Sequence, residues 1–114
     1  MENCIFCKII HGEIPSKKVY ENEYCYAFYD IQPQAQTHIL VVSKQHTPNI
    51  VHAVTNHAQD VLECMKAVAN ITQYLGLDKT GFRLITNCGR NACQSVEHLH
   101  FHILGGQALA DKMG

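Results

Sequence analysis

Three histidines alternate with large apolar residues in the segment His98-Leu99-His100-Phe101-His102. Because successive side chains of a β-strand point to opposite faces, this spacing predicts a strand that presents three imidazoles on one face and apolar side chains to a core. An imidazole can act as a nucleophile, an acid, a base or a metal ligand near neutral pH. At about 3.3 Å per residue the outer two Cα atoms lie roughly 13 Å apart, so one ion cannot bind all three rings. We therefore expect chemistry beyond metal binding.

Two of the six cysteines, Cys4 and Cys7, form a Cys-x-x-Cys pair near the start of the chain. Such a pair supplies two ligands of the kind that bind zinc, although the same spacing also occurs where thiols simply pack in a helical turn. A redox dithiol is disfavoured because the pair does not follow a strand in a βαβ context. The remaining cysteines are interpreted as core residues (Cys25, Cys64) or as loop residues without a partner at metal-binding spacing (Cys88, Cys93).

The bulk properties limit the function further. With 114 residues, of which 46% are hydrophobic, the chain is long enough for a single domain over residues 1–114 with a packed core. The formal charge of −1 disfavours binding to long nucleic acids, which requires an excess of Lys and Arg. No run reaches the roughly 18 apolar residues of a membrane helix, and the first residues do not resemble a secretion signal. We therefore expect a cytoplasmic protein whose thiols stay reduced.

The remaining pattern predicts an α+β fold in which one long helix covers an antiparallel sheet. The residues Cys4–His11 favour a short helix, and Asn56–Leu75 favour the long one, with Asn56 and Gln59 arranged as a capping box. Gly76 suits a left-handed turn at the end of this helix. Its predicted buried stripe is Val61, Leu62, Met65, Val68, Thr72 and Leu75. The five predicted strands are Val19–Glu21, Tyr24–Tyr29, His38–Ser43, Phe82–Asn87 and His98–Leu104.

These residues resemble the histidine triad (HIT) superfamily, and within it the Hint-like branch of nucleoside phosphoramidases. The resemblance covers nearly the whole chain. It rests on these ordered matches: Ile5-Phe6-Cys7-Lys8-Ile9-Ile10, Glu13-Ile14-Pro15, Ala27-Phe28-Tyr29-Asp30-Ile31, Pro33-Gln34-Ala35, Thr37-His38, Lys44, His46, Asn87, Gln94-Ser95 and the histidine segment followed by Gly105-Gly106. It implies a half-barrel sheet, and a homodimer in which the long helix and an edge strand join two sheets into one.

The resemblance also assigns roles to individual residues. His100 would attack the α-phosphorus of a nucleotide, releasing an amine, and water would then cleave the nucleotidyl-histidine; such an intermediate divides one hard displacement into two easier ones. His102 would donate hydrogen bonds to the phosphate. Asn87, Gln94 and Ser95 would complete a ring of donors for the charge that develops at phosphorus. His38 matches a family histidine near the site, and its role does not follow from the sequence.

The nucleotide-binding residues are implied in the same way. Asp30 would accept hydrogen bonds from both ribose hydroxyls. An apolar slot around the base would be formed by Phe6, Ile9, Ile14, Phe28 and Ile31. The substrates would be conjugates of a purine nucleotide, AMP or GMP, and no organic cofactor is expected.

Relatives that carry the Cys pair also imply a partner set for it. In them, the positions equivalent to His46 and His98 complete a structural zinc site with Cys4 and Cys7. A zinc ion with four protein ligands and no open position would tether the N-terminal segment to the first triad histidine. Two features depart from the family pattern, since Cys93 stands where a Gly is usual and Ser43 replaces a common Pro.

Three functions remain open from the sequence. The first is cleavage of the P–N bond of purine nucleoside 5′-phosphoramidates, which Gly105-Gly106 favours. The second is hydrolysis of dinucleoside polyphosphates through the same intermediate. The third is a zinc-stabilised nucleotide-binding or interaction module with weak catalysis, against which the presence of every expected polar residue argues.

Overall fold

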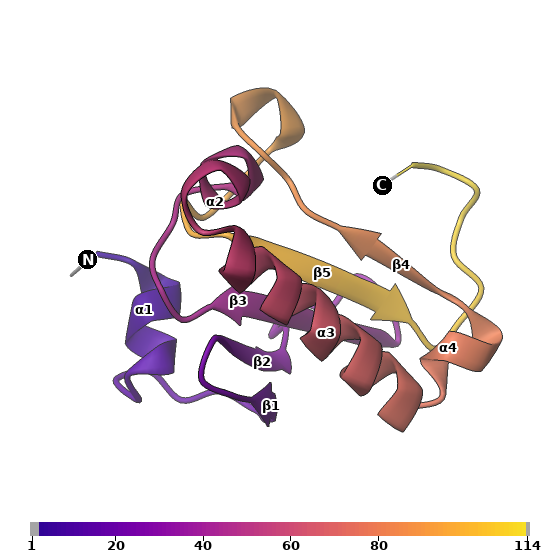
Figure 1. The fold of residues 1–114 in the computed structure, drawn as a ribbon. Coiled ribbons are helices and arrows are strands. Elements are labelled where there is room, and N and C mark those ends of the chain that lie inside the picture. Colours follow the sequence, from indigo (N-terminus) through magenta and orange to yellow (C-terminus); the bar gives the residue numbers. More distant parts are fainter. Residues whose placement is uncertain (1–2, 114) are drawn as a thin grey trace.

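The computed structural model of the chain describes residues 3–113 and contains a five-stranded sheet with helices on both of its faces (Figure 1). Residues 1, 2 and 114 of the predicted domain lie outside the described residues. The strands lie in the order β1-β2-β3-β5-β4, and every neighbouring pair is antiparallel, which confirms the predicted α+β class. Their bounds are β1 Lys18–Glu21, β2 Cys25–Tyr29, β3 Thr37–Ser43, β4 Phe82–Ile85 and β5 His100–Gly105.

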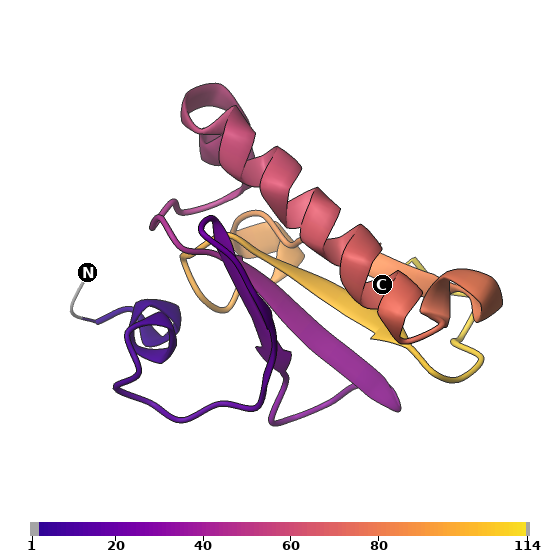
Figure 2. The same cartoon turned by 60° about the horizontal axis from the view of Figure 1, so that its bottom comes forward.

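The two faces of the sheet carry different side chains. One face is covered by the long helix α3 (Ala58–Tyr74), and Figure 2 shows this helix on the opposite side of the sheet from α1 (Ile5–Ile10). The side chains that alternate toward α3 form the main core, among them Ile39, Val41, Phe101 and Ile103. The opposite face holds a smaller apolar cluster under α1, made of Phe6, Ile9, Phe28, Leu40 and Val42.

The alternation places the histidines on the α1 side of the sheet. Leu99, Phe101 and Ile103 are buried in the core beneath α3, as predicted. In the pairing of β3 with β5, Leu40 lies opposite His102 and Val42 lies opposite His100. The face that carries the histidines therefore lies on β3 and β5, two inner strands whose backbones are hydrogen-bonded to a neighbouring strand on both sides.

The predicted long helix, Asn56–Leu75, is confirmed as α3, but a separate helix that was not predicted precedes it. Residues Ile50–Asn56 form a separate helix α2, capped by the side chain of Asn49, which accepts a hydrogen bond from the His52 N–H at 2.9 Å. The chain then bends at His57, the N-cap of α3, which makes no side-chain capping bond. The predicted capping box of Asn56 with Gln59 is therefore wrong, because an earlier cap starts the helical segment and leaves Asn56 inside α2.

The buried stripe of α3 also differs from the predicted one. Val68 and Thr72 are buried as expected, but Leu62 and Leu75 are 49% and 37% exposed. The buried residues of the helix are Cys64, Ala67, Val68, Ile71 and Thr72, and the predicted Val61 and Met65 pack against the core while partly buried. Gly76 has the predicted left-handed conformation (φ +75°), and after it a short helix α4 (Leu77–Thr80) begins with the buried Leu77.

The histidine strand β5 and its neighbour β4 are each shorter than predicted. β4 ends at Ile85, so Asn87 lies in the loop that follows it, which contains a short 3₁₀ helix, η1 (Arg90–Ala92). β5 begins at His100 rather than at His98. The amide of His98 donates to the Val96 carbonyl, and that of Leu99 donates to Thr47, so neither joins the ladder with β4.

No helix among residues 3–113 is long and apolar enough to cross a membrane.

Candidate active site and candidate metal site

His100, the middle histidine, is 3% exposed and sits at the start of β5. Its Nδ1 lies 2.7 Å from the backbone carbonyl oxygen of His98. Because a carbonyl only accepts hydrogen bonds, Nδ1 carries the proton and Nε2 keeps its lone pair. Burial lowers the pKa of His100, which keeps the ring neutral near pH 7. The ring of Phe6 packs edge-on against it at 5.0 Å between centroids. The arrangement leaves one unprotonated nitrogen in a fixed orientation, as a nucleophile requires.

A chain of hydrogen bonds sets the proton positions on the next two histidines. The backbone N–H of Gln34 donates to His38 Nδ1 at 3.0 Å, so the proton of a neutral His38 is on Nε2. This Nε2 lies 2.9 Å from Nδ1 of His102 and donates to it. The proton of His102 is then on its own Nε2, the nitrogen that is free to donate to a ligand. The geometry thus lets His38, whose role the sequence did not reveal, fix the tautomer of His102.

His38 and His102 are both neutral at physiological pH. Burial lowers the pKa of His38, against an opposing effect of Asp30. Burial, together with the neighbouring His100 and His38, lowers the pKa of His102 to about 4. A neutral His102 donates through one nitrogen only, and the hydrogen bond from His38 decides which one.

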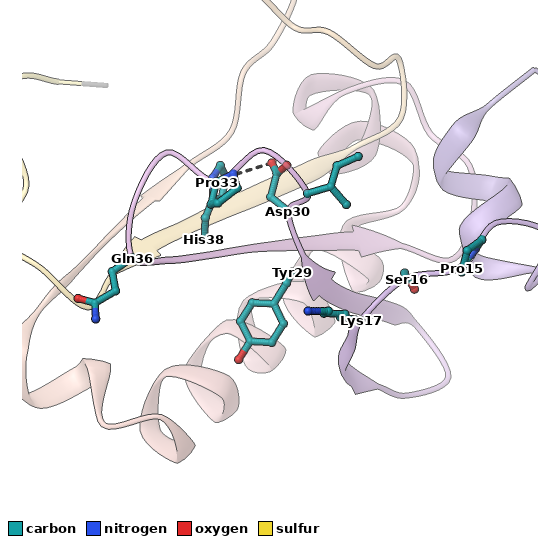
Figure 3. A pocket seen from close by; sticks show the side chains of 9 residues that line it. Pro15, Ser16, Lys17, Tyr29, Asp30, Pro33, Gln36 and His38 are labelled. Atoms are coloured by element: carbon teal, nitrogen blue, oxygen red, sulfur yellow. Dashed lines mark ion pairs between the residues drawn. The ribbon is translucent and has the colours of Figure 1, made fainter.

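Asp30 follows β2 and stands beside His38. One carboxylate oxygen accepts the Gln32 amide at 2.9 Å, and the other lies 3.4 Å from His38 Nε2 (Figure 3). Ligand atoms of Asp30, His38 and His102 lie within 4.8 Å of one another, which is close enough to hold a metal ion. A metal on His38 Nε2 would, however, move the ring proton to Nδ1, where it would face the Gln34 N–H. We therefore interpret this group as a proton-ordering chain.

A cavity of about 400 Å³ opens beside these groups and brings most of the predicted site residues together. Asp30, His38, Ser95, His100 and His102 form its polar wall. The cavity is also lined by all the predicted apolar residues, Phe6, Ile9, Ile14, Phe28 and Ile31. Leu40 and Val96, which were not predicted, line it as well. A cavity with one apolar side and a few convergent polar groups is typical of a small-molecule site.

A second cavity, of about 720 Å³, adjoins the first and shares Asp30, Ile31 and His38 with it (Figure 3). Its other walls include Lys17, Pro33 and Gln36. Asp30 therefore stands where the two cavities meet, with 20% of its side chain exposed.

Two predicted phosphate donors, Asn87 and Gln94, lie outside the cavity lining and hold the loop before β5 instead. The Gln94 amide donates to the carbonyls of Pro48 and Val96 at 2.7 and 2.9 Å, and its oxygen accepts the Gly89 N–H at 2.8 Å. The Asn87 side chain donates to Ala92 at 2.9 Å. These bonds position the Ser95 backbone at the cavity rim.

Cys93, in the same loop, adopts the left-handed conformation with φ +60°. A glycine is usual at this place in the family that the sequence resembles. The backbone geometry explains that preference, because a side chain in the left-handed region is strained.

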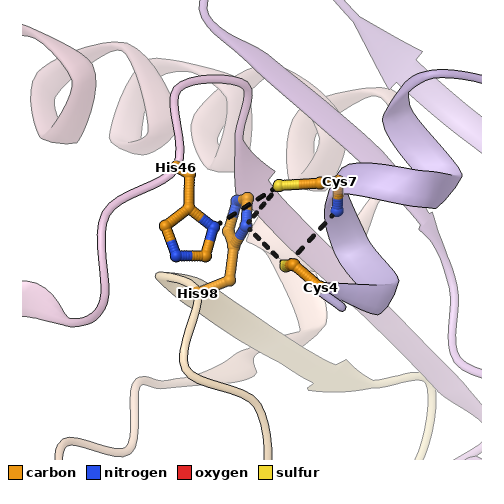
Figure 4. Close-up of side chains that lie close together, drawn as sticks. All are labelled: Cys4, Cys7, His46 and His98. Atoms are coloured by element: carbon orange, nitrogen blue, oxygen red, sulfur yellow. Dashed lines mark hydrogen bonds between the residues drawn. The ribbon is translucent and has the colours of Figure 1, made fainter. Parts of the chain in front are cut away.

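Cys4, Cys7, His46 and His98 converge beside the N-terminus of α1 (Figure 4). The Nδ1 atom of His98 lies 3.2 Å from the sulfur of Cys4 and 3.6 Å from that of Cys7, and His46 Nδ1 lies 3.4 Å from the Cys7 sulfur. With Zn–S bonds of about 2.3 Å and Zn–N bonds of about 2.0–2.1 Å, a tetrahedral site places its sulfur and nitrogen atoms about 3.5 Å apart. The four residues are thus close enough to hold a metal ion.

The far side of His98 supports the same conclusion. Its Nε2 lies 2.6 Å from the Ser43 carbonyl oxygen and must donate to it, so Nδ1 presents a lone pair to the two thiols. A ring nitrogen bonded to a carbonyl is the usual support for a metal-binding histidine. Burial also lowers the pKa of His98 to about 4 and that of His46 below its ordinary value, which favours the neutral rings that bind metals.

Backbone groups at Gln34 and Ser43 therefore determine which histidine nitrogens are available. Sequence reasoning missed both, because every residue type has a backbone amide and a carbonyl. Leu40 and Val96 could have been found, since Leu40 lies two residues after His38 and shares its strand face, and Val96 follows Ser95.

Comparison with known proteins agrees with this geometry. The HIT domain family model matches residues 11–109. The purine nucleoside phosphoramidase of Escherichia coli K12 is 41% identical over 108 residues, which cover 95% of this chain and 91% of that protein. An uncharacterized HIT-like protein of Helicobacter pylori is 43% identical over 109 residues, covering 90% of this chain and 95% of the relative.

Solved structures show the same relationship. A HIT family hydrolase from Clostridium thermocellum superimposes with a TM-score of 0.94 at 43% identity, over 99% of this chain and 98% of that one. A histidine triad protein from Clostridium difficile gives a TM-score of 0.94 at 44% identity, over 98% and 97% of the two chains. This chain belongs to the HIT family, and within that family it is a hydrolase.

Proposed function

We propose that this protein hydrolyses the P–N bond of purine nucleoside 5′-phosphoramidates through a nucleotidyl intermediate on His100. The observation that carries the proposal is the 2.7 Å contact between His100 Nδ1 and the His98 carbonyl, which leaves Nε2 free to attack. The similarity to a purine nucleoside phosphoramidase supports the choice of substrate.

In the first step, Nε2 of His100 forms a bond to the α-phosphorus while the bond from phosphorus to the amine breaks. The amine departs with a proton delivered from solvent past the exposed Ser95. His102 donates its Nε2–H to a phosphate oxygen and stabilises the charge that develops there. In the second step, water attacks phosphorus, the bond to His100 breaks, and the nucleotide leaves. In total, one phosphoramidate and one water give one nucleoside monophosphate and one amine.

The nucleotide would lie in the 400 Å³ cavity, with the base against Phe6, Ile9 and Phe28. Asp30 would accept hydrogen bonds from the ribose hydroxyls at the place where the two cavities meet. Asn87 and Gln94 would support the phosphate site through the loop that they hold. A ligand titration tests the ribose contact: Asp30→Asn should weaken AMP binding about tenfold or more, the value of a charged hydrogen bond, and should barely change the binding of 2′,3′-dideoxy-AMP.

Zinc is the metal that the Cys4, Cys7, His46 and His98 donor set fits best. When bound, it would supply a structural crosslink between the start of α1 and the segment before β5. The protein would need no organic cofactor.

The assembly would be a homodimer of single domains, located in the cytoplasm. Exposed apolar side chains lie on α3 (Leu62), at its C-cap (Leu75) and on the edge strand β4 (Phe82 and Leu84). Because β4 pairs only with β5 among the described strands, a second copy added at this edge would continue the sheet. Light scattering should give twice the monomer mass, and Leu84→Arg should shift the protein toward the monomer.

The activity is tested directly with adenosine 5′-phosphoramidate. Wild-type protein should release AMP and free amine, and His100→Asn should lower the rate by more than about 1,000-fold because it removes the nucleophile. A parallel assay with diadenosine polyphosphate separates the two hydrolase functions. Full turnover by His100→Asn, or tight AMP binding by a wild type that releases no amine, would contradict the proposal.

A further inference from the structure

Every polar group of His98 is engaged, although the residue is completely buried. The Nδ1 atom of its ring faces the sulfurs of Cys4 and Cys7, and Nε2 donates to the Ser43 carbonyl. Its backbone N–H donates to Val96 at 2.9 Å. Its carbonyl oxygen accepts the proton of His100 Nδ1 at 2.7 Å. One residue therefore belongs both to the metal cluster and to the support of the nucleophile.

The two roles are mechanically connected because ring and carbonyl belong to the same residue. The ring is held at one nitrogen by the metal cluster and at the other by β3. The following residue is fixed as well, since the Leu99 amide donates to the Thr47 carbonyl at 2.7 Å. The His98 carbonyl cannot move far while both ring nitrogens are bound. Without a ligand on Nδ1, the ring is held only by Ser43 and by contacts with thiols.

We propose that His98 couples metal binding to nucleotide binding, so that metal in the Cys4, Cys7, His46 and His98 site and nucleotide at His100 each strengthen the binding of the other. The coupling runs through the His98 carbonyl, which fixes the tautomer and orientation of the His100 ring. His98 is thus a positioning residue. This inference rests on the metal and nucleotide sites described under the proposed function, and it adds a thermodynamic link between them.

The link is reciprocal. If metal raises the affinity for AMP by some factor, AMP must raise the affinity for metal by the same factor. Couplings of this kind typically amount to about 5–150-fold. A metal that only stabilised the fold would leave both affinities unchanged in the fully folded protein, so both ratios would equal one.

The test measures both directions of the linkage in the full-length protein. Zinc affinity is determined by competition with a chromophoric chelator, with and without saturating AMP. AMP affinity is determined by calorimetry, with and without zinc. We expect both ratios to be equal and at least about fivefold. Ratios of one in both cycles would overturn the proposal, as would a wild-type protein that binds no zinc.

Two variants on the same strand localise the coupling. His100→Ala removes the ring that donates to the His98 carbonyl, so it should still bind zinc, but AMP should no longer change its zinc affinity. His102→Ala is the matched control: it should weaken AMP binding and keep the ratio at saturating AMP. Coupling that persists in His100→Ala would show that the His98 carbonyl does not transmit it.

A spectroscopic readout needs neither nucleotide nor turnover. The ¹⁵N shifts of His100 should report one tautomer, with the proton on Nδ1, in the zinc-loaded protein, and a mixture of tautomers after chelation. If the metal-free chain does not stay folded, zinc-loaded and cadmium-loaded proteins are compared, because the larger ion displaces the His98 ring. Identical His100 shifts in the two forms would overturn the inference. Amine release without coupling would refute this inference alone, and coupling without amine release would refute the proposed function alone.

Discussion

Two histidine clusters lie at opposite ends of one short segment and use the same side chain in opposite ways. In the metal cluster, the Nδ1 atoms of His46 and His98 converge on the sulfurs of Cys4 and Cys7. In the catalytic cluster, His38 accepts a hydrogen bond from Gln34 and donates one to His102, so His102 keeps its own proton on Nε2. Both are largely buried and neutral, so burial and charge do not distinguish them.

The difference lies in the backbone group behind each ring. A carbonyl behind His98 takes the proton from Nε2 and exposes a lone pair at Nδ1. An amide behind His38 occupies the lone pair of Nδ1 and exposes a proton at Nε2. The comparison teaches that the function of a buried neutral histidine follows from whether its far nitrogen meets a donor or an acceptor. His100 combines the two clusters, since its acceptor is the carbonyl of the metal-cluster residue His98.

Breaking the proton chain should have the largest effect after loss of the nucleophile. His38→Ala leaves His102 without a fixed tautomer, and we expect kcat to fall about 10–100-fold. His38→Gln is the matched control, because its amide can still donate to His102 and should restore most of the rate. Steady-state assays with adenosine 5′-phosphoramidate compare the two. Equal rates for His38→Ala and wild type would refute the proton chain.

Breaking the metal cluster should act on stability first. Cys4→Ser and Cys7→Ser should each reduce the zinc content below the one ion per chain expected of the wild type. Each should also lower Tm by at least about 5 °C, a loss on the order of 1–2 kcal/mol in the free energy of unfolding. Elemental analysis and thermal unfolding measure the two effects. Cys88→Ser, an exposed cysteine outside the cluster, is the control and should change neither quantity. Wild-type protein without zinc after purification in zinc-containing medium would exclude the site.

Acid should lower the free energy of unfolding in a pH range set by the catalytic cluster. Burial lowers the pKa of His102 to about 4, and its neighbours His38, His100 and Asp30 modify this effect. In the unfolded chain His102 binds a proton below about pH 6.5, whereas in the folded chain it does so only near pH 4. The free energy of unfolding therefore decreases as the pH is lowered from about 6.5 to about 4. His102→Ala should show a shallower fall in urea unfolding between pH 7 and pH 5. Parallel curves for the variant and the wild type would show that His102 keeps its ordinary pKa.

The smallest expected effect concerns the loop that joins the clusters to the rest of the sheet. Cys93 is the one non-glycine with positive φ among residues 3–113. Cys93→Gly should remove about 1–2 kcal/mol of strain and lose about 0.4–1 kcal/mol to the entropy of the unfolded chain. We therefore expect a net gain of about 0.5–1 kcal/mol in urea unfolding. Cys93→Val, which keeps the strain and adds a branch, should be less stable than wild type.

The sheet and its two faces could be predicted from the sequence because they follow from local patterns, whereas most cavity residues came from the resemblance to the HIT family. Alternation placed Leu99 and Phe101 in the core, and the resemblance selected Asp30 and Phe6, which line the cavity. The sequence could not predict the bend at His57, because Asn49 and Asn56 both suit an N-cap and tertiary packing selects between them. The buried face of α3 runs through Cys64, Ala67, Val68, Ile71 and Thr72, so Leu62 faces outward.

The donors and acceptors behind the rings could not be predicted either. Gln34 and Ser43 act through backbone atoms, and Gln94 uses its side chain to hold a loop instead of reaching the cavity. These positions depend on contacts between residues far apart in the chain, which no local pattern specifies.

The central claim is that Nε2 of His100 bonds covalently to phosphorus, and rapid-quench mass spectrometry tests it most directly. Mixing the protein with adenosine 5′-phosphoramidate and quenching within one turnover should reveal a chain heavier by one adenylyl group, which peptide mapping should place on His100. Amine release with no adduct at any quench time, or an adduct on another residue, would contradict the account.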